Sequence, residues 1–153
     1  MNNQQGSQTS CILALDFGLR RIGVATANSL TNTANALTTI TARDGQPDWA
    51  LMDQLIEEWQ PDILVLGLPY NIDNSESEMT ARVREFQQQL ADRYAISIAT
   101  TDERYTSAEA EALMKAARIK GTKTKRVTKD EIDALAAQLI AEQWLHKKSN
   151  NTN

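Results

Sequence analysis

Three acidic residues, far apart in the chain, stand where a carboxylate needs a partner. Asp16 closes the apolar run 11–15, Glu103 follows the strand-like run 95–99, and Asp133 lies on the packed side of the last predicted helix. A carboxylate in such a place is costly unless a cation joins it. Converging carboxylates without a His or Cys cluster favour hard divalent cations such as Mg²⁺ or Mn²⁺. Two such ions held by acids are the usual apparatus of phosphodiester hydrolysis.

Each of the first two acids also has an ordinary structural explanation. Asp16 precedes Gly18, and an Asp before a glycine often does no more than form a turn. Glu103 follows Asp102, and adjacent residues after a strand point to opposite sides, so the pattern alone does not say which acid faces a site. Arg104 either pairs with a nearby acid or holds a phosphate by a bidentate contact.

Asp133 is placed by helical periodicity. At about 100° per residue it falls about 60° from the centre of the predicted inner face, and it could be a boundary residue that pairs locally. Alanines one turn further on would let this helix approach a sheet closely. The predicted inner face consists of Ile132, Ala136, Leu139 and Ile140.

A basic segment precedes the last helix. Seven Lys and Arg residues and no acidic residue lie between Lys115 and Lys129, although the formal net charge of the chain is −4. The segment is either a solvated loop or a surface that binds the nucleic-acid backbone without reading sequence, since it has no aromatic residue for base stacking. The candidate nucleic-acid contacts are Arg104, Lys120, Lys123, Lys125, Arg126 and Lys129.

The composition fits one globular domain. The chain has 153 residues, of which 41% are hydrophobic, and no apolar stretch approaches the roughly 20 residues of a membrane span. We expect a flexible N-terminus over 1–10, a single domain over 11–146 and a flexible tail over 147–153. The single cysteine and the lack of a signal-peptide pattern lead us to expect a cytoplasmic protein without a membrane partner.

The order of secondary-structure signals predicts an α/β fold with a mixed five-stranded sheet flanked by helices. The expected strands are 11–16, 22–26, 35–41, 63–66 and 95–100. The expected helices run from Pro47 to about Gln60, from after Ser77 to about Tyr94, from Thr106 past Ala117, and from Thr128 or Asp130 to about Leu145. Helical periodicity predicts the inner faces of the first two, which consist of Trp49, Met52, Leu55, Ile56 and Trp59 and of Met79, Val83, Phe86 and Leu90. His146 is the only histidine, which makes histidine-based catalysis and zinc sites poor explanations.

The ordered motifs of the chain resemble those of the YqgF/RuvX family. Residues 15–18 and 21–25 (LDFG and RIGVA) look like its opening, and residues 65–69 (VLGLP) with Asn71 look like its central strand and loop. Residues 80–82 (TAR), 102–104 (DER) and 133–137 (DALAA) look like its remaining signatures. The resemblance runs from about residue 11 to 145 and departs from the usual pattern at Tyr70, Asn74 and Tyr105.

This resemblance implies a ribonuclease-H-like fold and a metal-dependent nuclease. The family was first named for a likeness to Holliday-junction resolvases and later tied to 5′-end maturation of small-subunit ribosomal RNA. By the same resemblance Asp16, Glu103 and Asp133 are the catalytic acids and metal ligands. The implied partners are precursor rRNA, branched DNA and ribosomal particles, with the protein a monomer or a homodimer.

Three alternatives stay open from the sequence. The first is a resolvase that cuts DNA junctions by the same chemistry. The second is an RNA-binding ribosome-assembly factor without catalytic activity. The third is an actin-like nucleotide binder, which also opens with Asp-x-Gly but needs two such domains. The sequence decides neither the cleavage position nor the choice between Mg²⁺ and Mn²⁺.

Overall fold

One mixed sheet organises the computed structural model, which describes residues 10–69, 76–102 and 128–150. Its six strands are arranged in the order β4-β3-β2-β1-β5-β6. The fold class predicted from the sequence is therefore confirmed, with the two-residue β4 as an additional strand. The strands are β1 (Cys11–Asp16), β2 (Arg21–Asn28), β3 (Thr33–Arg43), β4 (Gln46–Pro47), β5 (Ile63–Leu68) and β6 (Ser97–Asp102).

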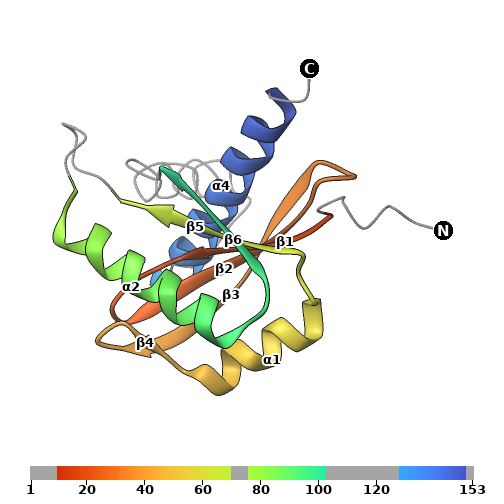
Figure 1. Ribbon diagram of the computed structural model, residues 1–153. Coiled ribbons are helices and arrows are strands. Elements are labelled where there is room, and N and C mark those ends of the chain that lie inside the picture. Colours follow the sequence, from red (N-terminus) through yellow and green to blue (C-terminus); the bar gives the residue numbers. More distant parts are fainter. Residues whose placement is uncertain (1–9, 70–75, 103–127, 151–153) are drawn as a thin grey trace.

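Strand direction brings several chain segments to one edge of the sheet. β1 is parallel to β5, and β5 is parallel to β6, whereas β2 is antiparallel to β1. The carboxyl ends of β1, β5 and β6 and the beginning of β2 therefore lie together, at the end of the strands that is on the left in Figure 1. We call this the carboxyl edge.

Helices cover both faces of the sheet (Figure 1). Helices α1 (Trp49–Trp59) and α2 (Glu78–Arg93) pack on one face, and α4 (Lys129–Asn150) packs on the other. Alternate residues of each strand face opposite sides, so Leu13 and Leu15 of β1 join the α1/α2 core while Ile12 and Ala14 join the α4 core. None of the helices within the described residues is long and apolar enough to cross a membrane.

The inner faces predicted for α1 and α2 are confirmed. Met52 of α1 is buried, and its predicted companions Trp49, Leu55, Ile56 and Trp59 pack against the same core. Val83, Phe86 and Leu90 of α2 are fully or almost fully buried there. The two helices are also clamped together, because Arg93 donates to both carboxylate oxygens of Asp53 at 2.8 and 2.7 Å. The bond to Arg93 lowers the pKa of Asp53 to about 2.

The start of α1 differs from the prediction. Pro47 does not open the helix. It belongs to β4 and pairs with Ala42 of β3. Asp48 is the N-cap, and its side chain accepts hydrogen bonds from the backbone N–H groups of Ala50 and Leu51. A carboxylate at the N-cap satisfies donors that the first helical turn leaves open, which proline at the first helical position would not do.

Two further boundaries move. β6 begins at Ser97 and reaches Asp102, two residues later at each end than predicted. Thr128 caps α4: its hydroxyl accepts from Glu131 N at 3.1 Å, and the Glu131 carboxylate accepts from Thr128 N at 3.1 Å. The helix then continues to Asn150, beyond the predicted end near Leu145. The helix predicted from Thr106 lies outside the described residues.

Candidate functional site

Asp16 ends β1 at the carboxyl edge and is bordered by glycines. Its cross-strand partner on β2 is Gly23. On the other side Leu15 is level with Leu66, which brings Asp16 level with Gly67 of β5, and Gly67 is paired with Thr101 of β6. On the two neighbouring strands only backbone therefore lies beside Asp16, and at Gly23 the space that a side chain would take is filled by the backbone of α4.

The Asp16 side chain points to the face that α4 covers. It continues the alternation of Ile12 and Ala14, both of which pack in the α4 core. Thr101, in the same row of the sheet, also faces α4, because its hydroxyl donates to Gln143 Oε1 at 3.3 Å. The half-buried Asp16 is thus on the α4 side of the sheet.

Asp133 is brought to this place by a close contact between α4 and β2. A Cβ atom on Gly23 would lie 2.0 Å from the backbone oxygen of Asp133, so the helix rests directly on the glycine. Because Gly23 is also the register partner of Asp16, the two predicted acids flank the same glycine. The structure thus brings Asp16 and Asp133 to one end of the α4 face.

The inner face of α4 is rotated relative to the prediction, toward Asp133. Ile132 and Leu139, predicted for its stripe, are only half-buried. The buried residues Ala137, Ile140 and Trp144 follow Asp133 at i+4, i+7 and i+11, which is the spacing of a single helical stripe. Ala134, Ala136, Ala141 and Leu145 are buried as well, so Asp133 lies beside the packed stripe.

Arg21 is the partner of Asp133. Its Nε donates to Asp133 Oδ2 at 2.7 Å and lies 3.7 Å from Asp130 Oδ1. The side chains of Arg21 and Asp133 are 30% and 27% exposed, so the pair is partly withdrawn from water. Arg21 stands two residues before Gly23 on the same face of β2. Arg21 therefore holds the side chain of Asp133, and Gly23 supports its backbone.

The third predicted acid lies just past the described part of β6. Asp102 is paired with Leu68, and Leu68 belongs to the α1/α2 core, so Asp102 is on the face away from α4. Asp102 is therefore on the opposite face from Asp16. Glu103 itself lies outside the described residues, as do Arg104, Lys120, Lys123, Lys125 and Arg126. Lys129, the last of the predicted basic contacts, is exposed in the first turn of α4.

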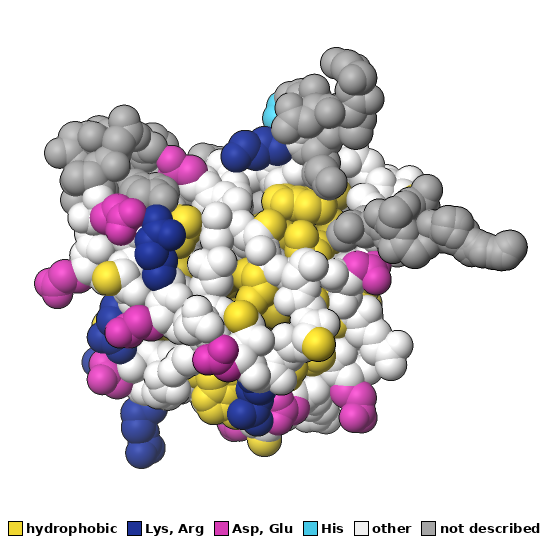
Figure 2. Space-filling model, viewed as in Figure 1, with side chains coloured by type: hydrophobic (Ala, Val, Ile, Leu, Met, Phe, Trp, Pro, Cys, Tyr) yellow, Lys and Arg dark blue, Asp and Glu magenta, His cyan; other side chains and the backbone are white. Residues whose placement is uncertain are grey.

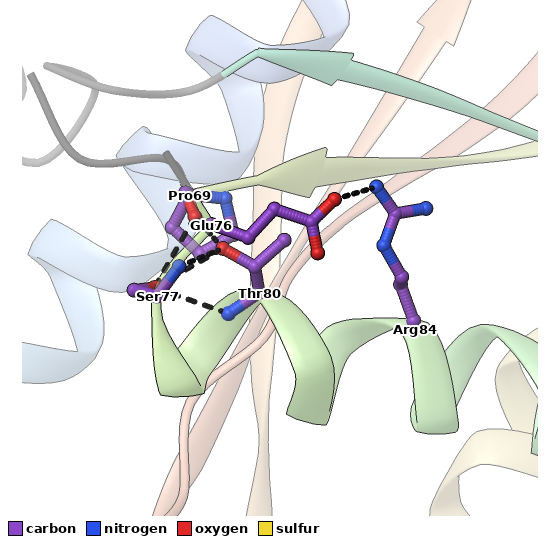
Figure 3. A network of polar contacts seen from close by, with 5 residues as sticks. All are labelled: Pro69, Glu76, Ser77, Thr80 and Arg84. Atoms are coloured by element: carbon purple, nitrogen blue, oxygen red, sulfur yellow. Dashed lines mark hydrogen bonds and ion pairs between the residues drawn. The ribbon is translucent and has the colours of Figure 1, made fainter. Parts of the chain in front are cut away.

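The segment that links β5 to α2 is anchored at both ends beside the carboxyl edge (Figure 3). The buried Thr80 hydroxyl donates to the carbonyl of Pro69, which directly follows β5. Ser77 caps α2 by accepting from Thr80 N at 3.2 Å, and Ser77 N donates to the Thr80 hydroxyl at 3.0 Å. Glu76 and Arg84 add an ion pair of 2.8 Å at the same place. The end of β5 and the start of α2 are thus fixed to each other.

A groove lies elsewhere on the molecule, and no acidic residue of the described segments lines it. An open groove of about 790 Å³ is lined by the second half of α2 and the beginning of β6, including Tyr94, Ile96 and Ile98. Figure 2 shows hydrophobic side chains gathered across the middle of the face that carries these elements. The groove meets β6 at Ser97, the end opposite to Asp102, so it is not part of the arrangement around Asp16.

The chemistry of the donor set fits a hard divalent cation. Asp16 and Asp133 offer carboxylate oxygens, the ligands that Mg²⁺ and Mn²⁺ prefer. Within residues 10–69, 76–102 and 128–150, no three His, Cys, Asp or Glu side chains come together as a metal site. Sequence reasoning did not assign roles to Arg21, Gly23 and Gly67, although all three lie within the motifs RIGVA and VLGLP.

The fold is that of the resolvase class of nucleases. Thermus thermophilus RuvC in complex with a Holliday junction substrate superposes with a TM-score of 0.57, at 12% identity, over 93% of this chain and 97% of that one. The yeast mitochondrial Holliday junction resolvase gives a TM-score of 0.56, at 16% identity, over 92% of this chain and 80% of that one. This agreement supports the ribonuclease-H-like fold that the sequence predicts.

The chain belongs to the RuvX family. The family model described as "RuvX: Holliday junction resolvase" matches residues 10–147. A protein of Yersinia enterocolitica named "Putative pre-16S rRNA nuclease" is 41% identical over 138 residues, which are 90% of this chain and 96% of that protein. A Haemophilus ducreyi protein of the same name is 44% identical over 133 residues, or 87% and 94% of the two chains. The family predicted from the sequence motifs is therefore confirmed.

Proposed function

We propose that this protein is a divalent-metal-dependent nuclease that cleaves precursor 16S ribosomal RNA near its 5′ end, acting in the cytoplasm. The observation that carries the proposal is that Asp16 pairs with Gly23 while the backbone of Asp133 rests on the same glycine, at the carboxyl edge of a resolvase-type sheet. The RuvX match supports the nuclease activity, and the relatives named for pre-16S rRNA support the substrate.

Each acid has a defined task in this proposal. Asp16 offers its oxygens level with Gly67, a glycine that would let a phosphate approach the backbone closely. Asp133 supplies oxygens from α4, which covers the face of the sheet to which Asp16 points, and Glu103 is assigned as the third ligand. Bound there, Mg²⁺ or Mn²⁺ would lower the pKa of an attacking water and neutralise charge on the leaving oxygen.

The choice of Glu103 over Asp102 rests on the faces of β6. Asp102 shares its face with the α1/α2 core and not with Asp16, so the assignment falls on its neighbour. Two matched variants separate the residues: Glu103→Gln should abolish metal-dependent cleavage, and Asp102→Asn should retain it. The opposite pattern would move the catalytic role to Asp102.

The basic residues are proposed to hold the RNA strand. Lys129 is exposed at the start of α4, the helix whose first turns carry Asp133. Arg104, Lys120, Lys123, Lys125 and Arg126 are assigned to the same task by the sequence. Such contacts go to the phosphate backbone, so we expect them to position the substrate and not to select a base sequence.

A cleavage assay tests the activity directly. Purified parent protein should cut a precursor 16S rRNA fragment in the presence of Mg²⁺ or Mn²⁺, and Asp16→Asn should not, since it keeps the shape of the side chain but removes its charge. Asp92→Asn, at an exposed position of α2, is the matched control and should cut normally. Equal cleavage by parent and Asp16→Asn would refute the catalytic assignment.

The second candidate function is resolution of four-way DNA junctions. It is favoured by the family description and by the fold shared with resolvases. The same assay with a DNA junction as substrate distinguishes the two, because the preferred substrate is the one cut faster at equal concentration. Binding of precursor rRNA without cleavage of either substrate would instead favour an assembly factor.

A further inference from the structure

Arg21 lies beside two acids of α4, and its guanidinium takes the place that a metal cation could take between them. The guanidinium lies 2.7 Å from Asp133 and 3.7 Å from Asp130, and these acids are three residues apart at the start of one helix. Acids at this spacing are neighbours on the helix surface and repel each other. The positive charge of Arg21 relieves that repulsion in the protein without metal.

The position of Asp133 leaves its carboxylate few other ways to be neutralised. Its backbone is fixed against Gly23, and the helix is held to the sheet by the buried residues Ala134, Ala136, Ala137, Ile140 and Ala141. The carboxylate therefore cannot leave the carboxyl edge by a movement of the helix without exposing this packing. A partly withdrawn carboxylate needs a cationic partner, and Arg21 is the partner that the structure provides.

We propose that Arg21 is a positioning residue that competes with the divalent ion for Asp133. In the metal-free protein it holds the carboxylate toward the sheet, and it has to give up that contact, at least in part, when a divalent ion binds Asp133. Arg21 thereby lowers the affinity for the metal while it stabilises the empty site. This inference rests on the proposed function, because it takes Asp133 as a metal ligand.

Replacing Arg21 should change the metal affinity in the direction opposite to that expected for a residue that helps to build the site. Removing a helper weakens metal binding, whereas removing a competitor strengthens it. An ion pair between half-exposed groups contributes up to roughly 1 kcal/mol, so we expect Arg21→Gln to bind Mn²⁺ about fivefold more tightly than the parent. Arg21→Lys keeps the charge but loses the fixed geometry of the guanidinium, so its affinity should lie between those of the parent and Arg21→Gln.

The experiment is a titration of the metal-free protein with Mn²⁺ by isothermal calorimetry, together with thermal unfolding with and without Mn²⁺. Arg20→Gln is the matched control, because it removes the same charge from the adjacent, exposed residue, which makes no ion pair among the described residues. Arg21→Gln should lower the melting temperature without metal more than Arg20→Gln does. It should also show the larger rise on addition of saturating Mn²⁺.

Two results separate this inference from the proposed function. If Asp133→Asn weakens Mn²⁺ binding but Arg21→Gln binds no more tightly than Arg20→Gln, then Asp133 is a ligand and the competition proposed here is wrong. If Asp133→Asn leaves Mn²⁺ binding unchanged, the metal assignment itself fails, and this inference fails with it.

Discussion

The absence of a side chain at Gly23 decides how closely α4 approaches the sheet. Gly23 pairs with Asp16 on one side and supports the backbone of Asp133 on the other. A single atom is therefore enough to disturb the relation between the two acids. Gly23 belongs to the RIGVA motif. The structure shows why a glycine stands at this position, because only glycine admits the helix at this distance.

Gly23→Ala should destabilise the protein by about 1–3 kcal/mol, the range for overpacked sites. The new methyl group would stand 2.0 Å from the Asp133 backbone oxygen, which is well inside van der Waals contact, so α4 has to move away from β2. Urea unfolding measures the loss, and Mn²⁺ titration measures whether the displaced Asp133 still binds metal.

The control for this substitution is Ala50→Ser, which also adds one heavy atom but at an exposed position of α1. It should change stability by less than about 0.5 kcal/mol. If both variants unfold at the same urea concentration, the close contact between Gly23 and α4 does not govern stability.

At the scale of elements, the Thr80 hydroxyl is the central link between β5 and α2, and the Ser77 hydroxyl also donates to the Pro69 carbonyl, at 3.4 Å. Thr80 is fully buried, donates to the Pro69 carbonyl and accepts from Ser77 N (Figure 3). The sequence motif TAR contains this residue, but its partners are known only from the structure. The hydroxyl links the carboxyl edge of the sheet to the first turn of α2.

Thr80→Val should cost about 1–3 kcal/mol, because it keeps the shape of the side chain and leaves the half-buried Pro69 carbonyl and Ser77 N–H without this partner. Thr80→Ser, which keeps the hydroxyl, is the control and should lose clearly less. The free energy of unfolding of both variants, measured in urea, decides between them. A valine variant as stable as the serine variant would mean that packing, and not the hydrogen bonds, holds this junction.

At the scale of the whole molecule, the distribution of charge matters more for nucleic-acid binding than the net charge does. The chain carries a formal net charge of −4, yet seven basic residues lie between positions 115 and 129 without an acid. A locally positive surface can bind a polyanion even on an acidic protein, because the field near the surface is set by the nearest charges.

Neutralising Lys123, Lys125 and Arg126 together should weaken RNA binding to a similar extent for unrelated sequences. It should also reduce the slope of log affinity against log salt by about 2, taking about 0.7 for each of three single-strand phosphate contacts. Binding of labelled RNA at several salt concentrations gives both values. Replacing Lys147 and Lys148 near the end of α4 is the control and should leave the slope nearly unchanged. An unaltered slope in the triple variant would show that the segment does not contact phosphate.

Local patterns in the sequence predicted much of this protein. Period-two and continuous apolar runs identified five strands, and helical periodicity identified the inner faces of α1 and α2, because these patterns depend on neighbours only a few residues away. The ordered motifs identified the RuvX family and singled out Asp16, Glu103 and Asp133. The catalytic roles of Asp16, Glu103 and Asp133 and the role of the basic segment stay predictions, as do the proposed domain limits.

The tertiary structure decided the features that depend on strand order and register. The pairing of Asp16 with Gly23, and the position of Asp102 on the opposite face, follow from how β1, β2, β5 and β6 are aligned. Likewise, the ion pair of Arg21 with Asp133 joins residues 112 positions apart, and no local pattern contains such a pair. The sequence by itself determined which residue types and elements are present. Their meeting at one sheet edge was decided only by the packing of α4 on β2, since that contact depends on the whole sheet being in place.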